Sequence, residues 1–224
     1  MDWQTTQSTG QSKIESIDFE QPSKKDCIYL DSLLSNDKSL NSADKKKYIT
    51  TLARFFPEHE NYHLGLYYQD TLISLLKTEN DIKKLADAYT DKSMIHDLLG
   101  QYPEALIASQ KALETYKLIN DQSGIASSYN DIGVIHYYRG EDSLSKVYLN
   151  QSGEIYKKLN DTSGLAIYFN NLANVYFEIG EGEKALDLYK KGYTFDIAME
   201  NEEGQVISLC NIGESYTYLK QYDK

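Results

Sequence analysis

One short segment has the spacing of a catalytic metal site. His59, Glu60 and His63 match the pattern H-E-x-x-H, in which zinc peptidases use two histidines one helical turn apart as ligands and the glutamate as general base. That chemistry needs all three side chains on one helix face. Here the motif follows Pro57 in a polar stretch that we expect to be a turn between two helices, and no obvious third ligand follows. We favour a chance match and keep a zinc peptidase as the remote alternative.

The other reactive side chains also lack partners for chemistry. His96 and His136 lie 40 residues apart in a column of aromatic residues, so we expect packed, hydrogen-bonded imidazoles. Nothing nearby completes a ligand set for them. Cys210 has no base on its own expected helix, and with Cys27 it makes too few cysteines for a disulfide framework or a four-cysteine zinc site. The sequence therefore predicts no enzyme, no metal and no cofactor.

Composition narrows the classes of partner. The chain has 224 residues and a formal net charge of −11, which argues against general binding to the nucleic-acid backbone and against docking on anionic lipid. Its 20 tyrosines indicate a folded chain. The N-terminus, Met1 to Gln4, has neither the basic nor the apolar region of a signal peptide. The compartment stays open: the cytoplasm is slightly favoured, and the periplasm fits if a leader was removed.

A repeat of 40 residues organises the sequence. The pairs Asn80-Asp81, Asn120-Asp121 and Asn160-Asp161 mark it, and three columns of like residues keep the same step. The glycine column is Gly100, Gly140 and Gly180; the small-residue column is Ala53, Ser93, Gly133, Ala173 and Gly213; the aromatic or histidine column is Phe56, His96, His136, Tyr176 and Tyr216.

Each repeat has the pattern of two helices. Ile125, Tyr129, Ile132 and His136 fall on one helical face, with Asp121 placed to cap the start. The small column implies that helices cross closely there, because large side chains would hold them apart.

The order aromatic, Leu or Ile, small residue, aromatic, Gly, small residue resembles the tetratricopeptide repeat. In this chain it is Phe169, Leu172, Ala173, Tyr176, Gly180, Ala185, Tyr189 and Gly192. The 40-residue step is similar to the longer variant found in bacterial signalling and regulatory proteins. The resemblance implies an all-α fold, a right-handed superhelical solenoid of antiparallel helix pairs. Lys92, where later repeats have Ile132 and Leu172, departs from the pattern, and no Pro closes the second helix.

The repeat also predicts how the chain is divided. We expect residues 1–20 to be disordered, residues 21–40 to form a capping helix and residues 41–224 to form the array. The expected repeats are about 41–80, 81–120, 121–160 and 161–200, with a partial repeat at 201–224. The last expected helix would expose an apolar face, which fits either a fragment of a longer protein or self-association through the open C-terminal end.

In this family the first helix of each pair lines the concave face, and the resemblance places the following residues there as a peptide-binding surface: Asn130, Val134, Tyr137, Asn170, Asn174, Phe177 and Glu214. An asparagine amide can pair with a peptide unit through both its donor and its acceptor. Tyr137 and Phe177 would add apolar pockets. The alternative that Asn130 and Asn170 brace neighbouring helices stays open.

These patterns predict a non-catalytic scaffold that binds a protein or an extended peptide segment in the concave groove. Asp87, Asp97 and Glu214 on this face favour a neutral or basic segment. The alternative function is a ligand-sensing input domain of a longer signalling protein, such as a transcription regulator or a sensor kinase.

Overall fold

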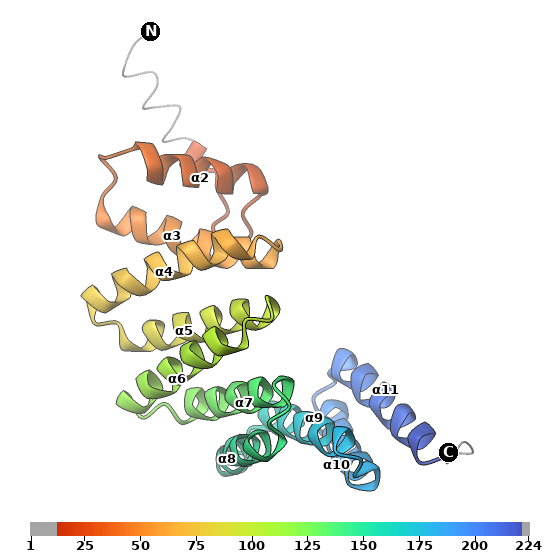
Figure 1. Cartoon of the computed structure of the whole chain (residues 1–224). Helices are drawn as coiled ribbons and strands as arrows, with labels where there is room; N and C mark the ends of the chain where they lie inside the picture. The colour runs from red at the N-terminus through yellow and green to blue at the C-terminus, as the bar shows by residue number, and fades with distance from the viewer. Residues whose placement is uncertain (1–12, 221–224) are drawn as a thin grey trace. The chain divides into compact units, whose positions relative to one another are not determined.

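The computed structural model describes residues 13–220, and the regular elements within that range are all helices (Figure 1). The chain divides into two compact units at Asn80/Asp81. The N-terminal unit contains α2 (Lys24–Asn36), α3 (Ser42–Glu58) and α4 (Tyr62–Glu79). The C-terminal unit contains α5 (Ile82–Leu98), α6 (Tyr102–Leu118), α7 (Gln122–Tyr138), α8 (Asp142–Leu159), α9 (Thr162–Glu178), α10 (Gly182–Ala198) and α11 (Glu202–Tyr218).

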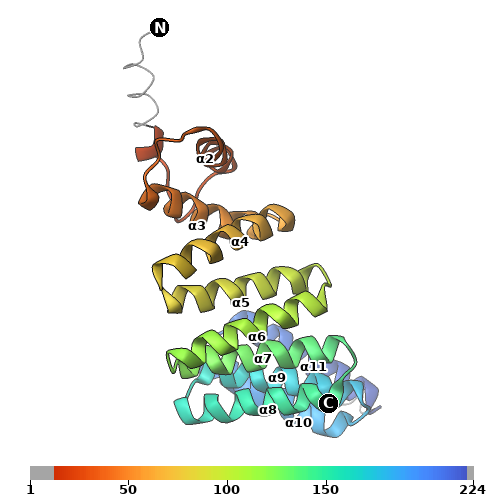
Figure 2. The same cartoon turned by 60° about the vertical axis from the view of Figure 1, so that its left-hand side comes forward.

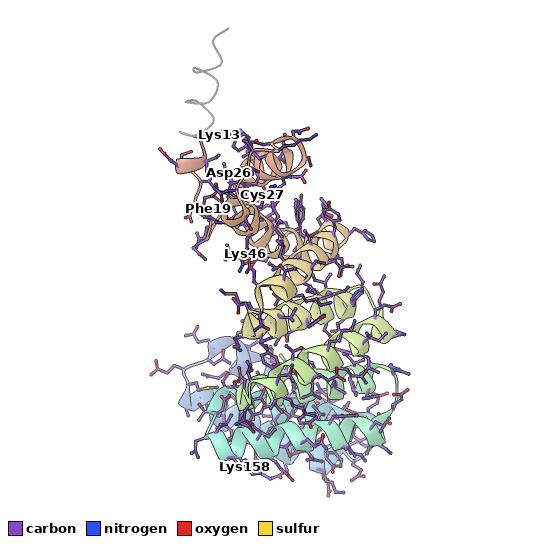
Figure 3. The ribbon with its side chains drawn as sticks, turned by 90° about the vertical axis from the view of Figure 1, so that its left-hand side faces the viewer. Lys13, Phe19, Asp26, Cys27, Lys46 and Lys158 are labelled. Atoms are coloured by element: carbon purple, nitrogen blue, oxygen red, sulfur yellow. The ribbon has the colours of Figure 1, made fainter. Side chains whose placement is uncertain are left out.

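Residues 13–20 pack against α3, so the expectation of disorder is wrong for them. Ile17 is buried, and the Phe19 ring stacks on Tyr48 with 5.8 Å between centroids. Phe19 is labelled in Figure 3. The guanidinium of Arg54 donates to the backbone oxygens of Phe19 and Glu20, at 2.6 and 2.8 Å. Two apolar side chains in a polar stretch give no periodic signal, and their partners lie some 30 residues away. Residues 1–12, also expected to be disordered, lie outside the described residues.

The α2 helix lies in the segment where a capping helix is expected. Ser23 and Asp26 form a capping box at its start, which satisfies free backbone N–H groups. Cys27 and Leu30 are fully buried. The Tyr68 hydroxyl of α4 donates to Asp31, which ties α2 to the α3–α4 pair.

The α3 and α4 helices form one antiparallel pair. Gly65 allows their close approach, because a Cβ there would lie 2.6 Å from Cγ of Pro57. Lys46 of α3, labelled in Figure 3, forms an ion pair with Glu79 at the end of α4.

In the C-terminal unit the turns repeat every 40 residues. Gly140 ends α7 with φ of 70°, and Asn120 and Asn160 end α6 and α8 with φ of 53° and 52°. These residue types tolerate the left-handed region best. Asp121 and Asp161 then cap the next helices by accepting from backbone N–H groups three residues on, at 3.0 and 2.9 Å. The predicted turn residues are confirmed.

Each helix of this unit packs on the next, and α7 also contacts α5 and α9 (Figure 2). Gly133 lies against α8 so closely that a Cβ would approach Cγ of Leu149 to 2.8 Å. Ala173 is fully buried. The predicted close crossings at the small-residue column are therefore confirmed.

The last helix, α11, is covered on one side. Ser208 donates to the buried Asp196 of α10 at 3.0 Å, which anchors α11 to the array. On the other side Leu209 is 49% exposed, and a Cβ at Gly213 would meet nothing within 4 Å. Within the described residues, no helix covers this face. None of the helices in the same range has the length and apolar character needed to cross a membrane.

Candidate functional site

The H-E-x-x-H residues do not share a helix face. His59 ends α3, with its ring stacked on Phe55 and its Nδ1 2.9 Å from the Phe55 carbonyl oxygen. Glu60 has φ of 60° in the turn, and His63 lies in the first turn of α4. The prediction that this motif falls in a turn is confirmed. Across residues 13–220, no group of three or more His, Cys, Asp or Glu side chains could hold a metal ion.

The two core histidines are packed and hydrogen-bonded, as predicted. Nδ1 of His96 lies 2.7 Å from Gln101 Oε1, and Nδ1 of His136 lies 2.5 Å from Glu141 Oε2. Each partner follows its histidine by five residues, so each imidazole closes the turn of its own helix pair. Both rings are buried, and this position is structural.

The cysteines differ in their environment. Burial raises the pKa of the Cys27 thiol to about 11, so this residue is an inert core side chain. Cys210 is exposed on α11.

A cavity of about 330 Å³ opens between α5, α7 and α9. These are the first helices of three successive pairs, and the cavity lies on the face they share. Three of the residues expected on the concave face line it: Asp97, Asn130 and Val134. The other residues that line it are Thr90, Ser93, Met94, Ser127, Asp131, Ile135 and Asn171.

Two carboxylates meet in this cavity. Oδ1 of Asp97 is buried and has no hydrogen-bond partner, and burial raises the pKa of Asp97. Burial and, to a smaller extent, the charge of Asp97 raise the pKa of Asp131 to about 6, while a hydrogen bond with Asn130 opposes the shift. Sequence reasoning placed Asp97 on this face but missed Asp131. Asn171, which also lines the cavity, occupies the same position of the repeat 40 residues later, so this position of the repeat could have been added to the expected face.

Asp87, also expected on this face, differs from Asp97 because its carboxylate is paired. Its carboxylate accepts from Lys83 at 3.0 Å and from the Tyr116 hydroxyl at 2.7 Å. Lys83 also pairs with Asp121 at 2.8 Å. Its charge is therefore compensated within the array, whereas that of Asp97 is not.

The three asparagines expected to bind peptide each use their side-chain oxygen inside the array. Asn130 Oδ1 accepts from Asn171 at 2.9 Å, which joins α7 to α9. Asn170 Oδ1 accepts from Ser208 of α11 at 3.3 Å, and Asn174 Oδ1 accepts from the Tyr189 hydroxyl of α10 at 2.6 Å. The bracing alternative thus has direct contacts in its support. The amide nitrogens of Asn170 and Asn174 remain as donors, since neither bonds to a described residue.

The two aromatic residues expected in the groove are half-buried by the array itself. Tyr137 packs against the cluster around Leu172 and Val175, and burial raises the pKa of its hydroxyl. Phe177 packs against α10 and lies 5.3 Å from the Tyr218 ring, centroid to centroid.

The remaining residue of the expected binding set, Glu214, is exposed on α11. The set is therefore spread over α7, α9 and α11, and only Asn130 and Val134 reach the cavity.

A second cavity, of about 370 Å³, lies between α9 and α10 and is lined by Leu172, Tyr176, Glu183, Lys184, Asp187 and Leu188. Two of its charged groups are paired within the array: Lys184 with Glu181, and Asp187 with Lys191 at 2.6 Å.

The sequence profile of the tetratricopeptide repeat family matches residues 165–194, which span most of α9 and α10. This segment has the order of small and aromatic residues on which the repeat was first inferred. Residues 165–194 form a tetratricopeptide repeat. No curated protein sequence matches it.

Solved structures share the fold of this chain at low sequence identity. The apo form of RapI matches with a TM-score of 0.77 and 16% identity, over 96% of this chain and 79% of RapI. A Rap protein complexed with competence and sporulation factor matches with a TM-score of 0.72 and 15% identity, over 87% of this chain and 54% of that one. BtubC from P. vanneervenii matches with a TM-score of 0.72 and 13% identity, over 89% of this chain and 85% of BtubC.

A longer protein matches over a smaller share of its own length. The signal transduction ATPase with a tetratricopeptide repeat sensor from Pyrococcus horikoshii has a TM-score of 0.70 and 20% identity, and the match covers 83% of this chain but 29% of that one. At these identities the similarity establishes the fold.

Proposed function

We propose that this protein is a non-catalytic scaffold that binds an extended peptide or protein segment along the face formed by α5, α7, α9 and α11. The observation that carries the proposal is the cavity between α5, α7 and α9, which keeps polar groups and apolar side chains accessible on the inner helices of three successive pairs. A packed array has no need of such a cavity, because protein interiors are otherwise close-packed.

The groove offers two kinds of contact to an extended segment. Amide nitrogens of Asn170 and Asn174 can donate to peptide carbonyl groups, even though their oxygens brace the helices. Met94 and Ile167, at 54% and 46% exposure, present apolar surface on the same face. Such a surface suits backbone capture with apolar anchors between the amides.

The negative charge of the protein favours one kind of bound segment over another. The chain carries a net charge of −11, and the acid in the cavity, Asp97, lacks a cationic partner. A neutral or basic segment therefore fits, and electrostatic attraction would mainly raise its rate of association. The similar Rap structure in complex with competence and sporulation factor supports the use of this fold to hold a bound factor.

Selection from a random peptide library against the full chain tests the proposal, with fluorescence anisotropy of the recovered peptides as the readout. We expect Asn174→Ala to weaken binding by about tenfold, the effect of losing one well-placed hydrogen bond and its contacts. Tyr189→Phe is the matched control, because it removes the hydroxyl that donates to Asn174 but leaves the amide in the groove.

The two variants separate binding from bracing. Each should lose about 1 kcal/mol of unfolding free energy, since each removes the same buried hydrogen bond. Only Asn174→Ala should lose affinity. Equal affinities for both variants would show that Asn174 is structural, and a library that gives no binder would refute the proposed function.

One observation favours a second function, that of the ligand-sensing input domain of a longer signalling protein. The exposed face of α11, around Leu209 and Gly213, is available to a further helix or to a second copy of the chain. The match to part of a signal transduction ATPase with a repeat sensor agrees with it. An output module in frame after Lys224 in the gene would support this function, and a stop codon there would exclude it. A chain that is dimeric in sedimentation and becomes monomeric on Leu209→Lys would instead assign the face to self-association.

A further inference from the structure

The cavity between α5, α7 and α9 contains an acceptor that the protein does not satisfy. Oδ1 of Asp97 is buried and has no hydrogen-bond donor among the described residues, and Asp97 lines this cavity. Buried polar groups are almost always paired, so an orphan of this kind calls for a ligand. Asp131 brings a second carboxylate to the same cavity from α7.

Three other acids of the C-terminal unit show what is missing here, because each pairs with a lysine. Asp87 and Asp121 share Lys83, and Asp187 pairs with Lys191. The residues that line the cavity include no Lys, Arg or His. Because the pKa of Asp131 is raised only to about 6, this acid is largely ionised at neutral pH and leaves negative charge without a counterion in the cavity lining.

The walls of the cavity fit an aliphatic chain that ends in a cation. Met94, Val134 and Ile135 supply apolar surface beside the two carboxylates. Lysine and arginine combine such a stem with a charged head, and they bury the stem along apolar surface where they can. The volume of about 330 Å³ is at the lower end for ligand pockets, roughly 300–1,000 Å³, which suits one side chain. A metal ion fits less well, because no three potential metal-binding side chains cluster in the part of the chain that the structure describes.

We propose that Asp97 and Asp131 form a subsite that receives a single basic side chain, lysine or arginine, of the bound segment. The inference rests on the proposed function and adds its specificity. The bound segment places a basic residue in the cavity beside α5 and α7. A charge-assisted hydrogen bond from the cation to Asp97 would satisfy the orphan oxygen.

The test uses the full chain and small probes, N-acetyl-arginine methylamide and N-acetyl-lysine methylamide, with the neutral N-acetyl-citrulline methylamide for comparison. Methyl NMR signals of Met94 and Ile135 report occupation of the cavity. We expect saturable shifts with the two cations and binding of the citrulline probe about tenfold weaker or less, since it lacks the charge. Asp97→Asn and Asp131→Asn should each weaken binding of the arginine probe about tenfold.

Glu114→Gln is the matched control, because it removes one negative charge from an exposed position on α6. It should leave binding of the arginine probe unchanged. Equal binding of the arginine and citrulline probes, or equal loss in Glu114→Gln and Asp97→Asn, would overturn the subsite. Shifts caused by divalent cations alone, with none from arginine or lysine, would also overturn it.

The outcome is distinct from that of the proposed function. Library peptides that bind with no preference for a basic residue, and that bind Asp97→Asn normally, would refute the subsite and leave the scaffold function standing. Binding of the arginine probe without any library binder would do the reverse.

Discussion

Two successive steps of the same groove have the same architecture and different chemistry. At the α5–α7 step the inward positions are Met94 and Asp97, with Asp131 facing them, and the cavity is acidic and open. At the α7–α9 step the equivalent positions, 40 residues on, are Val134 and Tyr137, with Asn171 in place of Asp131.

At the second step two of these residues bond or pack within the array, although Val134 and Asn171 also line the cavity. Tyr137 packs into the core cluster, and Asn171 donates to Asn130. The two steps thus have the same helix packing and differ at these three positions. The repeat sets how the helices pack, and the residues that depart from the repeat give the cavity its unpaired charge.

Asp131→Asn gives the largest expected effect, because it converts the acidic step into the neutral one. The folded pKa of about 6 lies above the ordinary aspartate pKa of 3.8, so the folded state favours the protonated acid. The free energy of unfolding that protonated Asp131 contributes is fully present below pH 3.8 and is lost as pH rises through 6. At pH 7 the variant should be more stable by about 3 kcal/mol, from roughly two pKa units.

Urea unfolding of both proteins from pH 3 to pH 7 measures this difference. The curves should meet at pH 3 and separate between pH 4 and pH 6. The other groups near Asp131 are Asp97 of α5, whose pKa is also raised, and Tyr156 of α8, so no neighbour titrates with the opposite sign in this window. If the wild-type protein is at least as stable as the variant at pH 7, the ionised Asp131 does not destabilise the folded state.

Gly133→Ala gives the next largest effect and tests the frame that both steps share, since α7 belongs to each. The added Cβ would meet Leu149, including its backbone nitrogen at 3.1 Å, so we expect a loss of about 2 kcal/mol from overpacking. Gly213→Ala is the control at the same register on α11, where the Cβ meets nothing within 4 Å. There the helix should gain about 0.5–1 kcal/mol. Thermal melts that shift in the same direction for both variants would contradict the shared packing.

The helix pairs and their turns were predictable, because the 40-residue columns repeat them several times over. Asp121 and Gly140 recur in register, and local capping rules then fix where each helix begins and ends. The packing of residues 13–20 was not predictable, because it depends on single contacts such as that of Phe19 with Tyr48 and not on any periodic pattern.

The candidate site was predictable in its register but not in its pairing. The resemblance to the repeat placed Asp97, Asn130 and Val134 on the inner face, where they line the cavity. The use of the asparagine oxygens depends on side-chain rotamers and helix spacing, as with the 2.6 Å hydrogen bond from Tyr189 to Asn174. No sequence pattern carries that information.

The most direct test of the account is photo-crosslinking of a library-selected peptide that carries benzoylphenylalanine next to its basic residue. The account predicts cross-links on α5, α7 and α9, foremost at Met94 and Val134 beside the two carboxylates. Cross-links concentrated at Leu188 or elsewhere on α10, in the cavity between α9 and α10, would contradict it.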